Sequence, residues 1–264
     1  FAKLALTCFL ASYFTRRYDE VRGKKFSAAK PFIVMGVLGI FLLAQPDLGS
    51  TVVLFVITFG MLFIVGANFW QFILLIGTGI LLFVWLVLSA SYRLKRFTGF
   101  LEPFKDPYGT GFQLTNSLMA FGRGEISGEG LGNSIQKLDY LPEAHTDFIM
   151  AIIGEEFGFI GILVVVVLLG LLIFRAMKIG RESLMLEQRF RGFFALGISF
   201  WIFFQGFVNL GMALGMLPTK GLTFPLVSYG GSSIIIMSAT VGILLRIDHE
   251  NRLQRGGQAR LRDD

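Results

Sequence analysis

The sequence predicts an all-α fold, a polytopic bundle of transmembrane helices with a large extracytoplasmic loop. Its 264 residues are 54% hydrophobic and include 29 Phe, and the mean hydropathy is +0.67. Apolar runs recur along the chain and approach the ~20 residues that span a bilayer. Backbone inside lipid is satisfied only in helices or closed barrels, and these runs lack the alternating period of barrel strands. We therefore expect residues 1–264 to form a single membrane domain.

The spanning helices follow from the apolar runs in order. Residues 1–15 resemble the end of a helix that begins before Phe1. Because the chain starts without Met or a charged leader, we interpret it as an N-terminally truncated fragment. Further helices are predicted at about 31–46, 50–67, 71–90, 148–174, 192–217 and 231–246. This gives about seven spans, a number that a helical hairpin stopping halfway would change.

Basic residues indicate the orientation of these helices. They gather in three clusters: Arg16, Arg17, Arg22, Lys24, Lys25 and Lys30; Arg175, Lys178, Arg181, Arg189 and Arg191; and Arg246, Arg252, Arg255, Arg260 and Arg262. The positive-inside bias places all three in the cytoplasm, and the order of the helices agrees. Segment 91–147 then lies outside, and 247–264 is a cytoplasmic tail. The net charge of +6 reflects this topology and contact with an anionic leaflet rather than binding to nucleic acid.

The outer segment 91–147 is long for a loop and rich in turn formers, as in "DPYGTG" and "FGRGEISGEGLGN". Loops of this length are usually functional or disordered. Its aromatic and apolar residues argue against disorder, so we predict an ordered cap. Within it, "GFQLTNSLMAFG" is helix-like and is expected to lie in the membrane interface.

Titratable residues crowd the stretch "LPEAHTDFIMAIIGEEFGF" at 141–159. Pro142 is suited to begin a helix, which would put Glu143 and Asp147 on one face, four residues apart. Such a pair suits general acid or base catalysis or cation binding. The alternative is a cluster that caps the helix and anchors it at the interface. We interpret His145 as structural.

Glu155 and Glu156 fall deeper in the same predicted helix. Carboxylates inside a membrane usually face a polar cavity and mark a pathway or site. Adjacent helical residues point about 100° apart, so both can hardly line one cavity. One of them is expected to pair with a neighbouring helix.

Two further polar residues fall at the predicted outer face. "AQPDLGS" places Asp47 at a helix junction, and "GMLPTKGLTFPLVSYGGSS" places Lys220 between two prolines. Proline and glycine at membrane depth free backbone groups that protein or a wet cavity must satisfy. Acids and a lysine around an outer cavity suit an anionic, lipid-linked substrate. Composition alone leaves a transporter equally open.

The stretches "AQPDLGSTVVLFVITFGMLFIVGA", "FGRGE", "GLGNSIQKLDYLPEAHTDFIMAIIGEEFGF" and "GMLPTKGLTFPLVSYGGSS" resemble motifs of the SEDS family (shape, elongation, division and sporulation), which are polytopic peptidoglycan polymerases. "FLEPFKDPYGTGFQLTNSLMAFGRGE" and "LLRIDHENR" are most similar to its cell-division member in Gram-negative bacteria. The resemblance runs along essentially the whole chain.

This resemblance implies about ten spanning helices in the intact protein, with an outer-face Gln-Pro-Ser-Glu motif just before Lys3. It also implies polymerisation of lipid II, in which the C4 hydroxyl of GlcNAc attacks the anomeric carbon of MurNAc with inversion. The family's essential acid falls on Asp147, the expected general base. Lys3 and Lys220 are candidates for phosphate contact. Other candidates for substrate contact are Asp47, Arg123, Lys137 and Glu143.

The resemblance further implies septal peptidoglycan synthesis for cell division in the bacterial inner membrane, at the division site. Expected partners are lipid II, membrane lipid, a class B penicillin-binding transpeptidase and other division proteins, but no nucleic acid. Mg or Mn is a possible cofactor at the pyrophosphate, although no residue spacing defines a metal site.

Two alternatives remain open. One is a lipid II flippase with Glu155 or Asp47 as a proton-coupled gate. The uncharged cytoplasmic segment "GANFWQF" counts against it, because a flippase needs a polar entrance on that side. The other is a non-catalytic division scaffold, which leaves the outer acids and lysine without a purpose.

Overall fold

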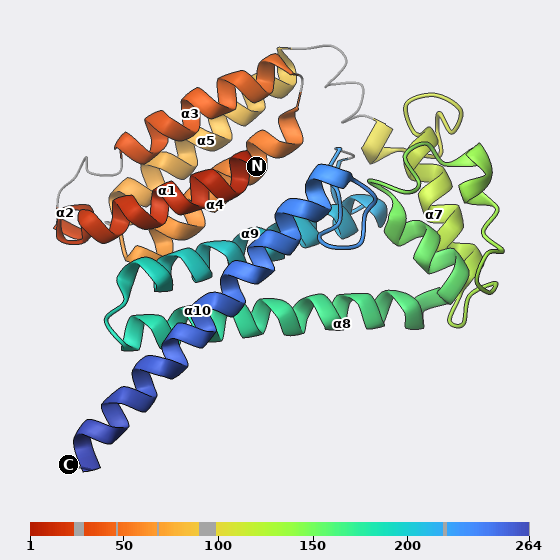
Figure 1. Cartoon of the computed structure of the whole chain (residues 1–264). Coiled ribbons are helices and arrows are strands. Elements are labelled where there is room, and N and C mark those ends of the chain that lie inside the picture. Colours follow the sequence, from red (N-terminus) through yellow and green to blue (C-terminus); the bar gives the residue numbers. More distant parts are fainter. Residues whose placement is uncertain (24–28, 46, 68, 90–98, 219–220, 264) are drawn as a thin grey trace. The chain divides into compact units, whose positions relative to one another are not determined.

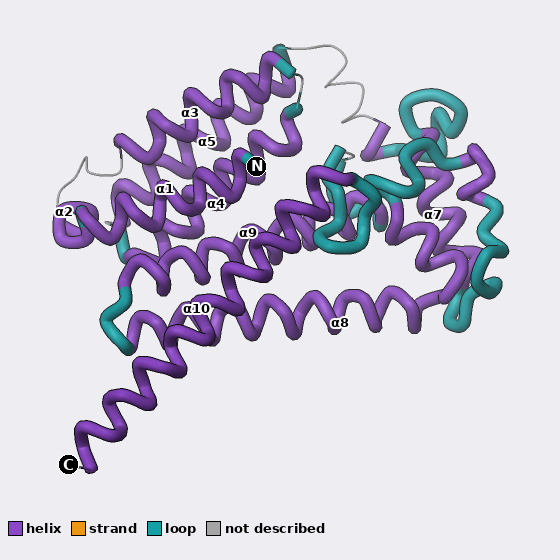
Figure 2. The backbone as a smooth tube through the Cα atoms, in the orientation of Figure 1, coloured by secondary structure: helices purple, strands orange, loops and turns teal. Residues whose placement is uncertain are grey.

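The computed structural model describes residues 1–23, 29–45, 47–67, 69–89, 99–218 and 221–263. Within these ranges the regular structure is helical and contains no strand (Figure 2). The predicted all-α class is therefore confirmed.

Figure 1 labels the α-helices along the chain. They are α1 (Ala2–Arg16), α2 (Tyr18–Gly23), α3 (Ala29–Ala44), α4 (Leu48–Val65), α5 (Phe69–Leu88), α7 (Phe112–Gly124), the π-helical turn η1 (Gln136–Tyr140), α8 (Ile149–Met185), α9 (Arg189–Ala213) and α10 (Gly231–Asp263). Each predicted spanning segment coincides with one of them. Two helices run past their predicted ends, α8 beyond 174 and α10 beyond 246.

Four of the described helices are long and apolar enough to cross a membrane: Leu48–Val65, Ile149–Met185, Arg189–Ala213 and Gly231–Gly256. Lys30–Ala44 is a shorter apolar helix. The multi-pass character follows from these helices. The number of about seven spans stays a prediction.

The chain divides into two compact units. Unit 1 comprises residues 1–77, 171–203 and 235–264, and unit 2 comprises residues 78–170 and 204–234. Helices α5, α8, α9 and α10 each contribute residues to both units.

In unit 1, close packing depends on glycine. A Cβ atom on Gly60 of α4 would lie 2.2 Å from the Phe200 ring of α9. The absence of a side chain at Gly60 thus lets the ring lie against the α4 backbone.

Buried polar contacts in unit 1 explain the long ends of α8 and α10. Asn251 is fully buried, and its Nδ2 donates to Ser183 Oγ at 2.9 Å and to the Ile179 carbonyl at 3.2 Å. Arg175 pairs with Asp248 at 3.2 Å. These contacts give the polar continuation of both helices a packed partner, which the apolar runs of the sequence could not indicate.

Unit 2 has a small apolar core where α7 meets the start of α8 and the end of α9. It consists of Ala120, Leu141, Ala144, Phe148, Ala151, Ile152 and Ala213. The buried Ser117 hydroxyl of α7 donates to the Ala213 carbonyl at 2.7 Å. The predicted helix at 111–122 is confirmed as α7, and its polar residues serve packing inside the unit.

Candidate active site

The turn at 142–148 carries the residues expected to do chemistry, and its shape corrects the sequence-based prediction. Helix α8 begins at Ile149 rather than at Pro142. Glu143 has a φ of 59°, in the left-handed region, and its carbonyl accepts from the Thr146 and Phe148 amides at 3.1 and 3.2 Å. Glu143 and Asp147 therefore do not occupy one helical face, and the prediction of such a pair was wrong. Residues of an α-helix occupy the right-handed region of φ/ψ space, so a residue in the left-handed region interrupts the helix.

The two acids of this turn have different surroundings. The Glu143 side chain is exposed and accepts from the Thr146 hydroxyl at 2.6 Å. Asp147 is half-buried, and a Cβ atom on Gly221 would lie 3.4 Å from its Oδ2. The Asp147 carboxylate thus lies beside the backbone of Gly221. Lys220 precedes Gly221 in the sequence but lies outside the described residues.

Helix α9 fixes the backbone of Asp147. The buried Asn209 donates from Nδ2 to the Asp147 carbonyl at 2.8 Å and also to the Leu222 carbonyl. One side chain therefore connects the acid-bearing turn to the segment that follows Lys220. Because one buried side chain bonds to both carbonyls, it holds the turn and this segment together.

The segment 221–229 is joined to the same turn by two more hydrogen bonds. The buried Ser228 hydroxyl donates to the Thr146 carbonyl at 2.6 Å, and the Tyr229 amide donates to the His145 carbonyl at 2.9 Å. His145 thus contributes its backbone, while its side chain is exposed. The sequence-based reasoning missed Asn209 and Ser228 as supports. A polar residue inside an apolar helix was the available signal for Asn209.

The two cations expected to contact substrate in the loop have acidic partners in α8. Arg123 Nη1 lies 3.2 Å from Glu155 Oε1, and Lys137 Nζ lies 2.6 Å from Glu156 Oε1. Glu155 is fully buried. It also accepts from the Ser134 hydroxyl and, at 3.1 and 3.2 Å, from the Ile135 and Gln136 amides. These contacts support a structural role for both pairs, and substrate contact by Arg123 or Lys137 stays a prediction.

A break in α8 explains why the glycine-rich loop lies against it. Gly158 has a φ of 65° and a ψ of −162°, so helical hydrogen bonding stops there. The Glu155 and Glu156 carbonyls instead accept from the Glu129 and Gly130 amides at 2.9 and 3.0 Å. The freed amides of Phe159 and Ile160 donate to carbonyls of the same loop, at Glu125 and Ile126. The loop thus satisfies backbone groups that lipid could not.

Lys3 and Asp47 belong to unit 1. Asp47 is the N-cap of α4, and its side chain accepts from the Ser50 amide at 2.8 Å. Its carboxylate also attracts the Lys3 ammonium electrostatically. The predicted helix junction at Asp47 is confirmed. Asp147 and its supports belong to unit 2.

The possible divalent cation stays a prediction. Among the residues that the structure describes, no group of three or more His, Cys, Asp or Glu side chains is arranged to hold a metal ion. An ion of this kind can be held by one carboxylate together with substrate phosphates.

A family model with the description "cell cycle protein", for FtsW, RodA and SpoVE, matches residues 1–253. The chain is 84% identical over its whole length to the probable peptidoglycan glycosyltransferase FtsW of Pasteurella multocida and 88% identical to that of Haemophilus influenzae, and it covers 67% of each. It is 57% identical to the FtsW of Escherichia coli O157:H7 over 96% of its length, which covers 61% of that protein. The chain thus spans about two thirds of the curated relatives it matches.

Solved structures of similar fold include a peptidoglycan synthase complex described as coordinating polymerization and crosslinking. Its matching chain gives a TM-score of 0.73 at 29% identity, with 95% of this chain and 69% of that chain covered. The rod shape determining protein RodA of Thermus thermophilus gives a TM-score of 0.62 at 27% identity, with 95% and 64% covered.

Proposed function

Because the chain belongs to the FtsW, RodA and SpoVE family of cell cycle proteins, a family of multi-pass membrane proteins, we propose that it forms the larger part of a septal peptidoglycan glycosyltransferase. This enzyme polymerises lipid II into glycan strands with inversion at the anomeric carbon. The names of its relatives and their identity over the whole chain support this activity. The resemblance of the motifs to the SEDS polymerases agrees with the family match.

The observation that carries the mechanism is the position of the Asp147 carboxylate beside Gly221, on a turn whose main chain Asn209 holds. Asp147 accepts the proton of the GlcNAc C4 hydroxyl as that oxygen attacks the anomeric carbon of MurNAc. The bond to the pyrophosphate breaks in the same displacement, which requires inversion. A base held by Asn209 and by the segment 221–229 loses little orientation entropy during the reaction.

Charge on the departing undecaprenyl pyrophosphate needs positive groups nearby. From the resemblance of the motifs, we assign this role to Lys3 and Lys220, and to a bound Mg or Mn ion if one is present. The role of Lys220 is assigned because Lys220 precedes Gly221 in the sequence, and Gly221 lies beside the Asp147 carboxylate.

We place loop 91–147 in the periplasm and the protein at the division site. A transpeptidase of the class B penicillin-binding type is the expected partner, because emerging strands must be crosslinked. Phe104 and Tyr108 are strongly exposed on this loop, at 65% and 92%, which suits a docking surface. Phe100 is half-buried, and Phe97 lies outside the described residues.

The test compares full-length wild type with Asp147→Asn, each reconstituted in vesicles with the transpeptidase and labelled lipid II. Glu102→Gln is the matched control, because Glu102 is an exposed acid of the same loop that pairs with Lys105. Glycan strands are measured on gels, and lipid II transfer between leaflets is measured on the same vesicles. Asn keeps the shape of Asp but cannot take the proton, so we expect strand synthesis to fall about 10²- to 10⁴-fold with lipid II binding unchanged.

Normal polymerisation by Asp147→Asn would contradict its role as base. Wild type that moves lipid II between leaflets without making strands would identify a flippase. Wild type that does neither but still binds the transpeptidase would favour a scaffold.

A further inference from the structure

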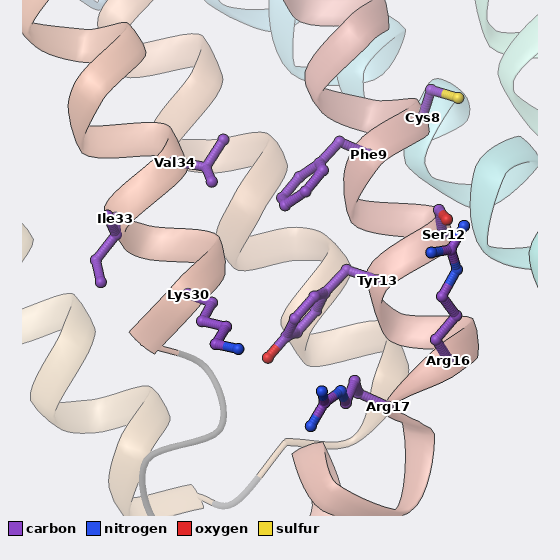
Figure 3. A pocket seen from close by; sticks show the side chains of 9 residues that line it. All are labelled: Cys8, Phe9, Ser12, Tyr13, Arg16, Arg17, Lys30, Ile33 and Val34. Atoms are coloured by element: carbon purple, nitrogen blue, oxygen red, sulfur yellow. The ribbon is translucent and has the colours of Figure 1, made fainter.

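A pocket of about 630 Å³ lies between α1 and α3 in unit 1, a volume typical of ligand sites. Its lining residues are Cys8, Phe9, Ser12, Tyr13, Arg16, Arg17, Lys30, Ile33 and Val34. Figure 3 shows Phe9 and Tyr13 projecting from α1 toward α3, and Lys30 projecting from α3 toward α1. None of these residues has a part in the proposed glycosyl transfer.

The polarity of the pocket changes along its length. Arg16, Arg17 and Lys30 lie where α1 ends and α3 begins, whereas Phe9, Ile33 and Val34 line the part farther along the helices. Arg16 follows Cys8 by two helical turns, about 12 Å at 1.5 Å per residue. Figure 3 shows the Arg16 side chain reaching back along α1 to Ser12, whereas Lys30 extends toward Tyr13 from α3. The two cations therefore lie on either side of Tyr13, and Phe9, Ile33 and Val34 form the apolar part of the pocket.

The pocket has an excess of positive charge. Arg17 is neutralised by Glu20, which accepts two hydrogen bonds from its Nη1 at 3.0 and 2.8 Å. The lining residues include no acid, and within the described part of the chain Arg16 and Lys30 form no hydrogen bond or ion pair. Two cations are thus available beside the apolar part of the pocket.

We propose that this pocket binds an anionic phospholipid, with the charged headgroup lying between Arg16 and Lys30 and an acyl chain along Phe9, Ile33 and Val34. The chemistry favours a lipid over a soluble anion, because the apolar walls would gain nothing from free phosphate. Basic pockets between spanning helices at the cytoplasmic side suit such headgroups. The site lies at the basic end of α1 and α3, where sequence predicts the cytoplasmic leaflet.

The test is native mass spectrometry of the full-length protein, delipidated in detergent and titrated with phosphatidylglycerol or phosphatidylcholine. Two variants act on different parts of the pocket. Arg16→Gln with Lys30→Gln removes charge, and Val34→Trp fills the apolar part without changing charge. Arg260→Gln with Arg262→Gln is the control, because it removes the same charge from the C-terminal tail.

We expect wild type to retain one phosphatidylglycerol in preference to phosphatidylcholine. Each basic group near an anionic headgroup contributes a factor of roughly five, so the loss of Arg16 and Lys30 should weaken retention roughly thirtyfold. Val34→Trp should weaken retention of the same lipid, and the tail control should not.

Three results would overturn the proposal. Equal retention of both lipids would show that charge does not select the ligand. An equal loss in the tail control would show nonspecific attraction. In lipid-free protein, the third result would be strong protection of Cys8 from a small maleimide that is lost when the segment before Phe1 is removed. This result would show that the segment fills the pocket. A protein that makes no glycan strands but binds phosphatidylglycerol as expected would contradict the proposed function and leave the lipid site supported.

Discussion

Asn209 donates a hydrogen bond from its side-chain amide to the main-chain carbonyl of Asp147, over 2.8 Å between nitrogen and oxygen. The same amide group reaches the Leu222 carbonyl. A residue of α9 therefore sets the distance between the acid-bearing turn and the segment that follows Lys220.

Asn209→Leu should reduce the polymerisation rate about tenfold or more with little change in the KM for lipid II. The substitution leaves the Asp147 and Leu222 carbonyls without this donor, at a cost of about 1–3 kcal/mol, and releases the turn that carries Asp147. The measurement is strand synthesis by full-length protein in vesicles, together with the melting temperature.

Asn251→Leu is the matched control for Asn209→Leu, because Asn251 is equally buried and also donates to a main-chain carbonyl. It should lower the melting temperature without reducing the rate in the protein that remains folded. Equal loss of rate in both variants would assign Asn209 a general stabilising role.

Lys137→Ala should destabilise the protein by about 3–5 kcal/mol, because it leaves the Glu156 carboxylate without its cation in a mostly buried site. Only 9% of the Glu156 side chain is exposed. The readout is the free energy of unfolding, or the melting temperature where unfolding is irreversible.

Lys105→Ala provides the comparison for Lys137→Ala. It removes an ion pair of similar length, 2.7 Å, whose side chains are 78% and 62% exposed. Exposed pairs contribute little, so its melting temperature should match wild type. Similar melting temperatures for the two variants would mean that solvent screens the Lys137–Glu156 pair as well.

Gly158→Ala should strongly destabilise α8. The left-handed φ disfavours any side chain, and a Cβ atom there would lie 2.4 Å from the Ile126 carbonyl oxygen. The added methyl would push the glycine-rich loop away from the helix break and expose unpaired backbone groups. Loss of melting temperature and increased amide exchange at 155–160 are the expected results.

Gly170→Ala lies in the same helix with nothing within 4 Å of the added atom. It should be neutral or stabilising by up to about 1 kcal/mol, since alanine is the better helix former. Equal melting temperatures for Gly158→Ala and Gly170→Ala would contradict the packing of the glycine-rich loop against the helix break.

Single cysteines at Leu131 and Glu187, with Cys8 replaced, should differ in their labelling by an impermeant maleimide in spheroplasts. Both positions are exposed, and the basic clusters place the first outside and the second inside. Labelling at Leu131 alone is expected, and both should label after permeabilisation. Equal labelling in intact spheroplasts would reject the proposed topology.

Phe104→Glu and Tyr108→Glu should reduce co-purification of the full-length protein with the transpeptidase, because a charge would be buried at the proposed contact. Leu131→Glu is the control, as it adds the same charge at a 76% exposed apolar residue of the same loop. Retention of the partner by both aromatic variants would place the interface elsewhere.

The sequence by itself determined the helices, because the length and apolarity of the runs leave lipid-embedded backbone no other regular structure. Its long ungapped motifs also identified the family and singled out Asp147. Tertiary structure alone decided the local geometry at 142–148, where contacts from Ser228, Tyr229 and Asn209 accompany a left-handed Glu143 instead of a helical start. It also decided that Arg123 and Lys137 pair with Glu155 and Glu156. Such pairings join residues 19 and 32 positions apart in the chain, and no periodic pattern encodes a contact at that separation.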